Sequence, residues 1–133
     1  MANVYFKNKI YSNKDFPKQR LPVAKYDQCI FKDCTFGQGD LPNCTFIEPE
    51  FINCNLSSGL IKHTCFQEVE FTECKILDIK FNQYNHFLLS IRFNSCLLNL
   101  SSFHQLKLVR TLFSNCKLHE VDFTESNLKK SEL

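Results

Sequence analysis

Large apolar residues recur at every fifth position along most of the chain. The series begins at Phe6 and continues unbroken to Phe81, slips by two residues, and resumes from Leu88 to Leu133. Two residues before each of these central positions the side chain is usually small or apolar. Seven of the eight cysteines stand at this second position: Cys29, Cys34, Cys44, Cys54, Cys74, Cys96 and Cys116. The fold must therefore bury two positions in every five.

The five-residue pattern also builds a longer unit. Five segments of the form Phe-x-x-Cys-x-(large apolar) follow one another at spacings of 20, 20, 22 and 20 residues. They occupy residues 31–36, 51–56, 71–76, 93–98 and 113–118. A fixed period of this size is typical of repeat architectures.

Neither an α-helix nor a straight strand can bury such a pattern. Five residues advance a helix by about 500°, so successive apolar side chains would scatter around it. On a strand, side chains alternate, and an odd spacing sends them to opposite faces. The pattern is buried if the chain turns a corner every five residues, because four corners then close a square coil with both apolar positions inside. We therefore predict an all-β solenoid of about six stacked coils.

This repeat resembles that of the pentapeptide-repeat proteins. The resemblance covers roughly Asp15 to Leu133 and implies the fold of that family, a right-handed quadrilateral β-helix. Asp15-Phe16, followed by Leu21 and Tyr26, is similar to the entry coil of the quinolone-resistance (Qnr) group of the family.

The length of 133 residues allows one domain, with two irregular places in it. Lys9 and Lys14 occupy positions that should point inward, and a buried unpaired lysine is prohibitive. We therefore expect residues 1–14 to form a cap or an arm and residues 15–133 to form the β-helix. The two extra residues fall in the interval 82–87, which we interpret as a corner bulge that restores the phase. The alternative is a loop that touches a partner.

The placement of the cysteines indicates a buried role. Cys34, Cys54, Cys74, Cys96 and Cys116 would form one column with a spacing of about 4.8 Å. Parallel Cβ vectors do not readily give the disulfide dihedral near 90°, and a tetrahedral metal site needs converging ligands rather than a row. Small buried hydrophobes are the favoured interpretation, with a metal ladder as the alternative. Cys65 lies off the inward register and should be more exposed.

No catalytic constellation is apparent. His63, His104 and His119 fall at outward positions on different coils, and His86 lies in the bulge. The chain has no phosphate-binding loop and no Cys-x-x-Cys pair, so we predict neither an enzyme nor a bound cofactor or metal. A net charge of +2 gives no reason to expect direct nucleic-acid binding. Without an apolar run of membrane-spanning or signal-peptide length, we expect a cytoplasmic protein that does not bind membranes.

The outer surface carries a predicted acidic strip. Folding at a period of 20 stacks Glu48 over Glu68 and Glu50 over Glu70, with Glu73 and Asp33 on the adjoining face. Past the two-residue slip these columns turn basic at Arg92 and Arg110. The strip is either a solvated face or a partner-binding surface. Its residues are Asp33, Glu48, Glu50, Glu68, Glu70 and Glu73.

Several outward positions are apolar and define a second candidate surface. This surface would be the docking site for the N-terminal arm, for a second protomer or for a foreign partner. The last coil ends in phase without a terminating motif, so either the chain is truncated or another copy covers the open end as a homodimer. The candidate apolar residues are Phe87, Leu89, Leu97, Leu100, Val109 and Leu112.

These features favour a non-enzymatic protein-interaction or scaffold module with an unidentified partner. The resemblance to the Qnr group implies an alternative: a DNA mimic that binds DNA gyrase or a related topoisomerase and protects it against quinolones. The acidic strip is the feature of this chain that fits that alternative.

Overall fold

The computed structural model describes residues 4–37, 43–58, 64–81, 91–108 and 111–127. Within these ranges it contains ten short parallel strands and no helix, and hence no helix that could cross a membrane. The strands are β1 (Tyr5–Lys7), β2 (Ile10–Ser12), β3 (Lys25–Asp27), β4 (Ile30–Lys32), β5 (Thr45–Ile47), β6 (Glu50–Ile52), β7 (Cys65–Gln67), β8 (Val69–Thr72), β9 (Ile91–Asn94) and β10 (Leu112–Ser114).

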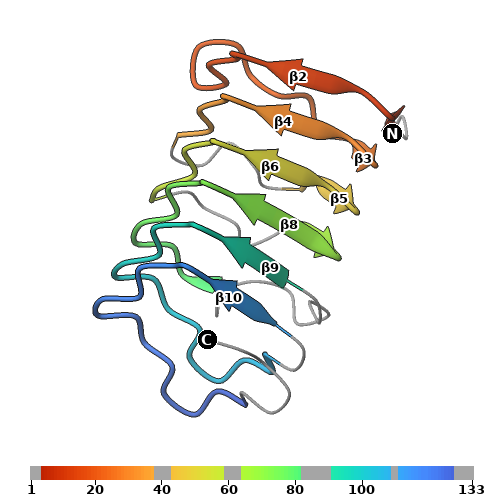
Figure 1. The fold of residues 1–133 in the computed structure, drawn as a ribbon. Coiled ribbons are helices and arrows are strands. Elements are labelled where there is room, and N and C mark those ends of the chain that lie inside the picture. Colours follow the sequence, from red (N-terminus) through yellow and green to blue (C-terminus); the bar gives the residue numbers. More distant parts are fainter. Residues whose placement is uncertain (1–3, 38–42, 59–63, 82–90, 109–110, 128–133) are drawn as a thin grey trace.

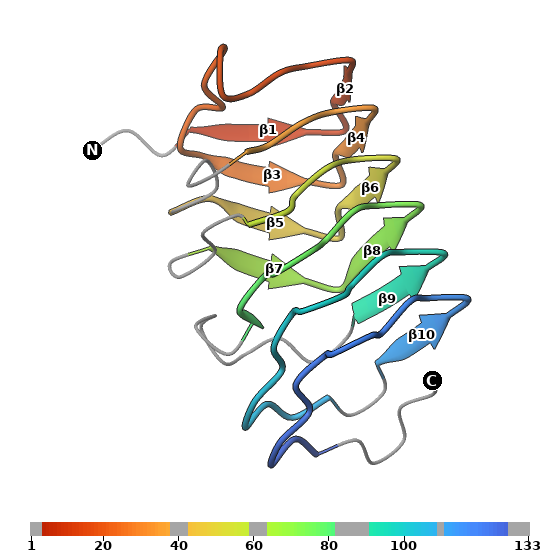
Figure 2. The ribbon, with the colours of Figure 1, turned by 90° about the vertical axis from the view of Figure 1, so that its left-hand side faces the viewer.

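The strands form two walls of a coil that stacks upon itself. One wall has the order β2-β4-β6-β8-β9-β10, and the neighbouring wall has the order β1-β3-β5-β7 (Figure 1, Figure 2). Paired residues lie 20 apart, as in Phe31 against Phe51. Between β8 and β9 the step is 22, and Phe71 pairs with Phe93. The expected bulge at 82–87 lies outside the described residues, but the register is restored on its far side.

Single β-bridges supply the other two walls. Thr35 and Asn55 pair on the third wall, and Lys80, Ser102 and Asp122 pair in series on the fourth. The coil therefore has four sides and closes once every 20 residues, as the five-residue pattern predicts. The predicted fold class is confirmed: the chain is an all-β, right-handed quadrilateral β-helix.

The core is a set of stacked aromatic rings. Phe51 is fully buried, with ring centroids 5.0 Å from Phe31 above it and 5.1 Å from Phe71 below it. Rings on adjacent walls meet edge to face, as in Phe46 against Phe51. Each such ring contributes about 1.5–3 kcal/mol through burial, with about 0.5–1.5 kcal/mol more per well-placed aromatic pair.

A residue with positive φ marks almost every corner. These residues stand two positions after the central apolar residue, as Asn53 (φ 50°) follows Phe51. Most are Asn, Asp, Glu, Gln or Ser. Asn and Asp tolerate this conformation best, because their short polar side chains can hydrogen-bond locally. Leu100 (φ 67°) is an apolar exception and is 55% exposed.

The N-terminal segment takes part in the coil. β1 pairs with β3 and β2 with β4 at the same 20-residue step, so the described part of residues 1–14 is a first turn and not a detached arm. Lys9 and Lys14 escape burial because their side chains face solvent at the open edge of this turn. The lysines therefore do not prevent the coil from forming.

All five cysteines of the column that starts at Cys34 are hydrogen-bonded, and four of them are buried. The thiol of Cys54 donates to the carbonyl oxygen of Phe31 at 3.2 Å, and the thiol of Cys74 donates to that of Phe51 at 3.3 Å. Ser101 takes an equivalent inward position, and its hydroxyl donates to the Ile76 carbonyl at 2.7 Å. All eight cysteines are free thiols. Where the second inward position holds one of these cysteines or Ser101, its small donor bonds the preceding turn.

Thiol reactivity should follow this burial. Six cysteines are buried, whereas Cys65 and Cys116 are only partly so. Burial also raises the pKa of the Cys44 thiol and so lowers its thiolate fraction. We expect an aromatic disulfide reagent to titrate at most two thiols in the native protein and all eight after denaturation. Rapid native reaction of more than two thiols would contradict the buried columns.

Candidate functional site

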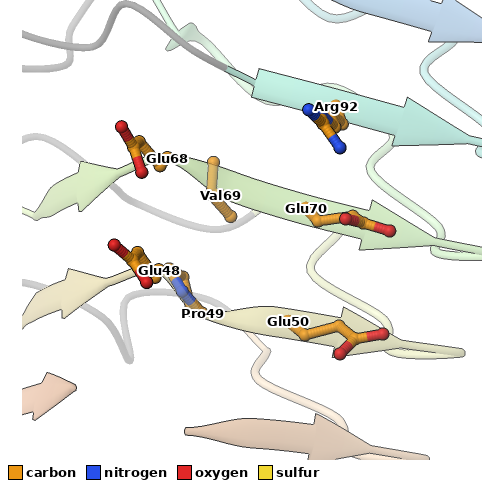
Figure 3. A pocket seen from close by; sticks show the side chains of 7 residues that line it. All are labelled: Glu48, Pro49, Glu50, Glu68, Val69, Glu70 and Arg92. Carbon is orange, nitrogen blue, oxygen red and sulfur yellow. The ribbon is translucent and has the colours of Figure 1, made fainter. Parts of the chain in front are cut away.

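Four glutamates of the predicted strip gather on the six-stranded wall. Glu50 on β6 and Glu70 on β8 are register partners and point outward. Glu48 and Glu68 precede these strands at corners with φ of 48° and 53° (Figure 3). Because the register is 20 residues, the four carboxylates form two rows that are one strand spacing apart, about 4.8 Å.

These glutamates line a hollow of about 440 Å³, here called the acidic hollow. Its lining also includes Pro49 and Val69, both buried, and Arg92 on β9 (Figure 3). Arg92 lies opposite Glu70 in the register of the β-ladder. Arg92 marks the change of sign that the sequence predicted along this column.

The carboxylates of the acidic hollow have few partners within the protein. The Gln28 side-chain amide donates to Glu48 Oε2 at 3.1 Å, and that of Asn94 donates to Glu70 Oε1 at 3.4 Å. Within the described part of the chain, no cation lies at ion-pair distance from any of the four glutamates. Their negative charge is therefore not neutralised by an ion pair with any cation in the described ranges.

The other two predicted acidic residues lie elsewhere. Asp33 and Glu73 stand at the corner on the opposite side of the six-stranded wall, with Asn53 between them in the same column. The Asn53 amide donates to Asp33 Oδ1 at 2.7 Å. These residues line a separate hollow with thiols of the cysteine column. The predicted strip is thus two groups of carboxylates and not one continuous surface.

The candidate apolar surface is not assembled among the described residues. Leu97 lies on the third wall, Leu112 on β10 and Leu100 at a corner, so the three belong to different faces. Phe87, Leu89 and Val109 lie outside the described residues, so the rest of this surface stays a prediction.

The sequence pattern did not predict a group of polar residues on the fourth wall. Ser102 pairs with Asp122, and the Ser102 hydroxyl accepts the backbone N–H of His104 at 3.2 Å. The hydroxyl and backbone N–H of Thr124 donate to Asp122, and with His104 nearby they lower the pKa of that carboxyl. The 20-residue register could have revealed this group.

That group lacks the geometry of a catalytic triad. The His104 imidazole hydrogen-bonds neither the Ser102 hydroxyl nor the Asp122 carboxylate, so no base activates a nucleophile. His119 lies on the third wall beside Glu120, while His63 and His86 lie outside the described residues. No three His, Cys, Asp or Glu side chains in the described ranges are placed to share a metal ion.

Known proteins resemble this chain in repeat and in fold. A trypsin-treated variant of QnrB1, a plasmid-mediated fluoroquinolone resistance protein, matches with a TM-score of 0.64 and 16% identity over 95% of this chain and 73% of its own. Full-length QnrB1 matches with a TM-score of 0.55 and 15% identity over 96% and 71%. No curated protein matches the sequence. Residues 96–133 match the family model described as Pentapeptide repeats, in 8 copies. Residues 96–133 are therefore similar to pentapeptide repeats, and the described coils before residue 96 turn a corner every five residues in the same way.

Proposed function

We propose that the chain is a non-catalytic interaction module that binds a basic surface of another protein through the acidic hollow. The observation that carries this proposal is a set of four glutamates on one wall, none of which has an ion-pair partner among the residues that the structure describes. Positions fixed by a parallel ladder lose little conformational freedom on binding, which favours recognition of lysine and arginine side chains. The buried floor of Pro49 and Val69 keeps the carboxylates at a set spacing.

The proposal can be tested with a lysine-rich peptide as the probe. Amide chemical-shift changes on titration should centre on the acidic hollow and fall steeply with salt, because the contact is electrostatic. The Glu48→Lys/Glu68→Lys variant should lose them.

The matched control is Asp78→Lys/Glu120→Lys. Both residues are exposed and have positive φ of 56°, like Glu48 and Glu68, but they stand at a different corner. This variant carries the same charge change in the same backbone conformation and should bind like the wild type. Equal loss in both variants would mean that only net charge matters, and the proposal would fail.

A second candidate is protection of DNA gyrase from quinolones. The fold similarity to QnrB1, together with exposed carboxylates in rows, supports testing it. The test is a gyrase supercoiling assay with and without a quinolone. The candidate predicts an altered response that the Glu48→Lys/Glu68→Lys variant loses and the Asp78→Lys/Glu120→Lys variant keeps. Unchanged supercoiling at micromolar protein would remove this candidate and leave the first proposal standing.

A further inference from the structure

Among the described residues, the first turn forms the N-terminal edge of both sheets. β1 and β2 are the last strands of the two walls and pair on one side only (Figure 2). The rings of Phe6 and Tyr11 are half-buried because no described turn covers them. Such an edge is a template on which another turn could stack.

Lys9 and Lys14 occupy two of the inward columns of this first turn. The Lys9 carbonyl accepts the N–H of Ile30 at 2.9 Å, and the Lys14 carbonyl accepts the N–H of Thr35 at 2.9 Å. These contacts fix both lysines directly above Cys29 and Cys34 in the stack. Both lysine side chains are exposed, whereas the two cysteines are buried.

The turns that are covered on both sides show what stacking would do to these positions. In Lys9's column, Cys29, Val69 and Ile91 are at most 2% exposed. Lys14's column is equally buried at Cys54 and Cys74, where each thiol reaches back to a carbonyl of the preceding turn. A side chain in these columns therefore lies under whatever turn precedes it. An added turn would strip the two ammonium groups of water and offer them no carboxylate from these columns.

We infer that Lys9 and Lys14 act as a gate that prevents a second copy of this chain from stacking onto the N-terminal edge. Stacking of like turns is a head-to-tail contact, and such contacts do not close but propagate into filaments. An inward charge on an edge is an effective block, because it leaves the fold below intact and penalises only the added layer. This inference does not depend on the proposed function of the acidic hollow.

The test compares two charge-matched double variants by sedimentation velocity over a hundredfold range of protein concentration. Lys9→Ala/Lys14→Ala removes the gate. Lys7→Ala/Lys18→Ala removes two exposed lysines of the same turn that lie outside the inward columns. We expect the gate variant to gain mass with concentration, shifting its association at least tenfold, while the control sediments like the wild type. Equal behaviour of both variants would overturn the inference.

A second double variant and a salt titration complete the test. Lys9→Thr/Lys14→Ser places small hydroxyl residues in the columns and should also associate, even if the alanine variant is poorly folded. Raising the salt concentration should leave the wild type unassociated, because salt screens repulsion between exposed charges but does not offset desolvation of a buried one. Association of the wild type at high salt would show that charge repulsion alone opposes stacking, and it would overturn the inference.

Discussion

Phe51→Ala should lower the free energy of unfolding by about 3–5 kcal/mol. The ring is fully buried and stacks on Phe31 and Phe71 with interplanar angles of 13° and 18°. It also meets Phe46 and Phe66 edge to face. The rigid ladders on either side keep the turns about 4.8 Å apart, so the wall cannot collapse into the space that the ring leaves.

Phe6→Ala is the matched control for this prediction. Phe6 is half-buried in the first turn, and among the described rings it stacks only on Tyr26, at 5.3 Å. Its loss should be roughly half as large, because less apolar surface returns to water. Chemical denaturation followed by far-ultraviolet circular dichroism measures both variants. Equal losses at the two positions would contradict a core built from continuous ring stacks.

Cys74→Lys should be the second strongly destabilising change, lowering the free energy of unfolding by at least about 3 kcal/mol. Cys74 is 1% exposed and is enclosed by the turns of Cys54 and Cys96. A lysine there repeats what Lys14 does in the same column of the first turn, but without access to water. The control is Cys65→Lys, because Cys65 points outward on β7 and its replacement should change stability by less than about 0.5 kcal/mol.

The deficit of Cys74→Lys should shrink as the pH rises. Burial lowers the lysine pKa in the folded state, whereas the unfolded chain keeps it near about 10.4. Between these values the unfolded state binds more protons, so stability increases with pH. Denaturation midpoints at neutral pH and near the unfolded pKa test this. A deficit that is independent of pH would mean that the lysine has found a solvated position.

The sequence predicted the fold because one physical constraint dominates it. A corner every fifth residue is the arrangement that hides both Phe51 and Cys54, so the pattern specifies the strand register as well as the topology. The first turn was harder to predict, because Lys9 and Lys14 break the inward rule and only the geometry of the edge shows why they can. Burial patterns do not say which end of a column is open.

The surface was predicted less completely than the core. Register alone placed Glu50 beside Glu70 and Arg92 after them. It also placed Asp33 and Glu73 on the adjoining face, but it joined all six acidic residues into one strip, whereas the structure puts these two in a separate hollow. The same 20-residue spacing also brings Ser102 beside Asp122. Both positions are polar, so the pattern of apolar residues does not point to them. Outward residues are not constrained by burial, so their roles depend on partners.

The central claim is that residues one coil apart lie directly over one another. Nuclear Overhauser spectroscopy on isotope-labelled protein tests it most directly. The structure places the centroids of the Phe31 and Phe51 rings 5.0 Å apart. The backbone N–H of Asn53 donates to the carbonyl oxygen of Thr72 at 2.8 Å. We predict ring-to-ring cross-peaks between Phe31 and Phe51 and between Phe51 and Phe71, with backbone contacts at the same step. Contacts at three- and four-residue spacing in their place would contradict the fold and every surface derived from it.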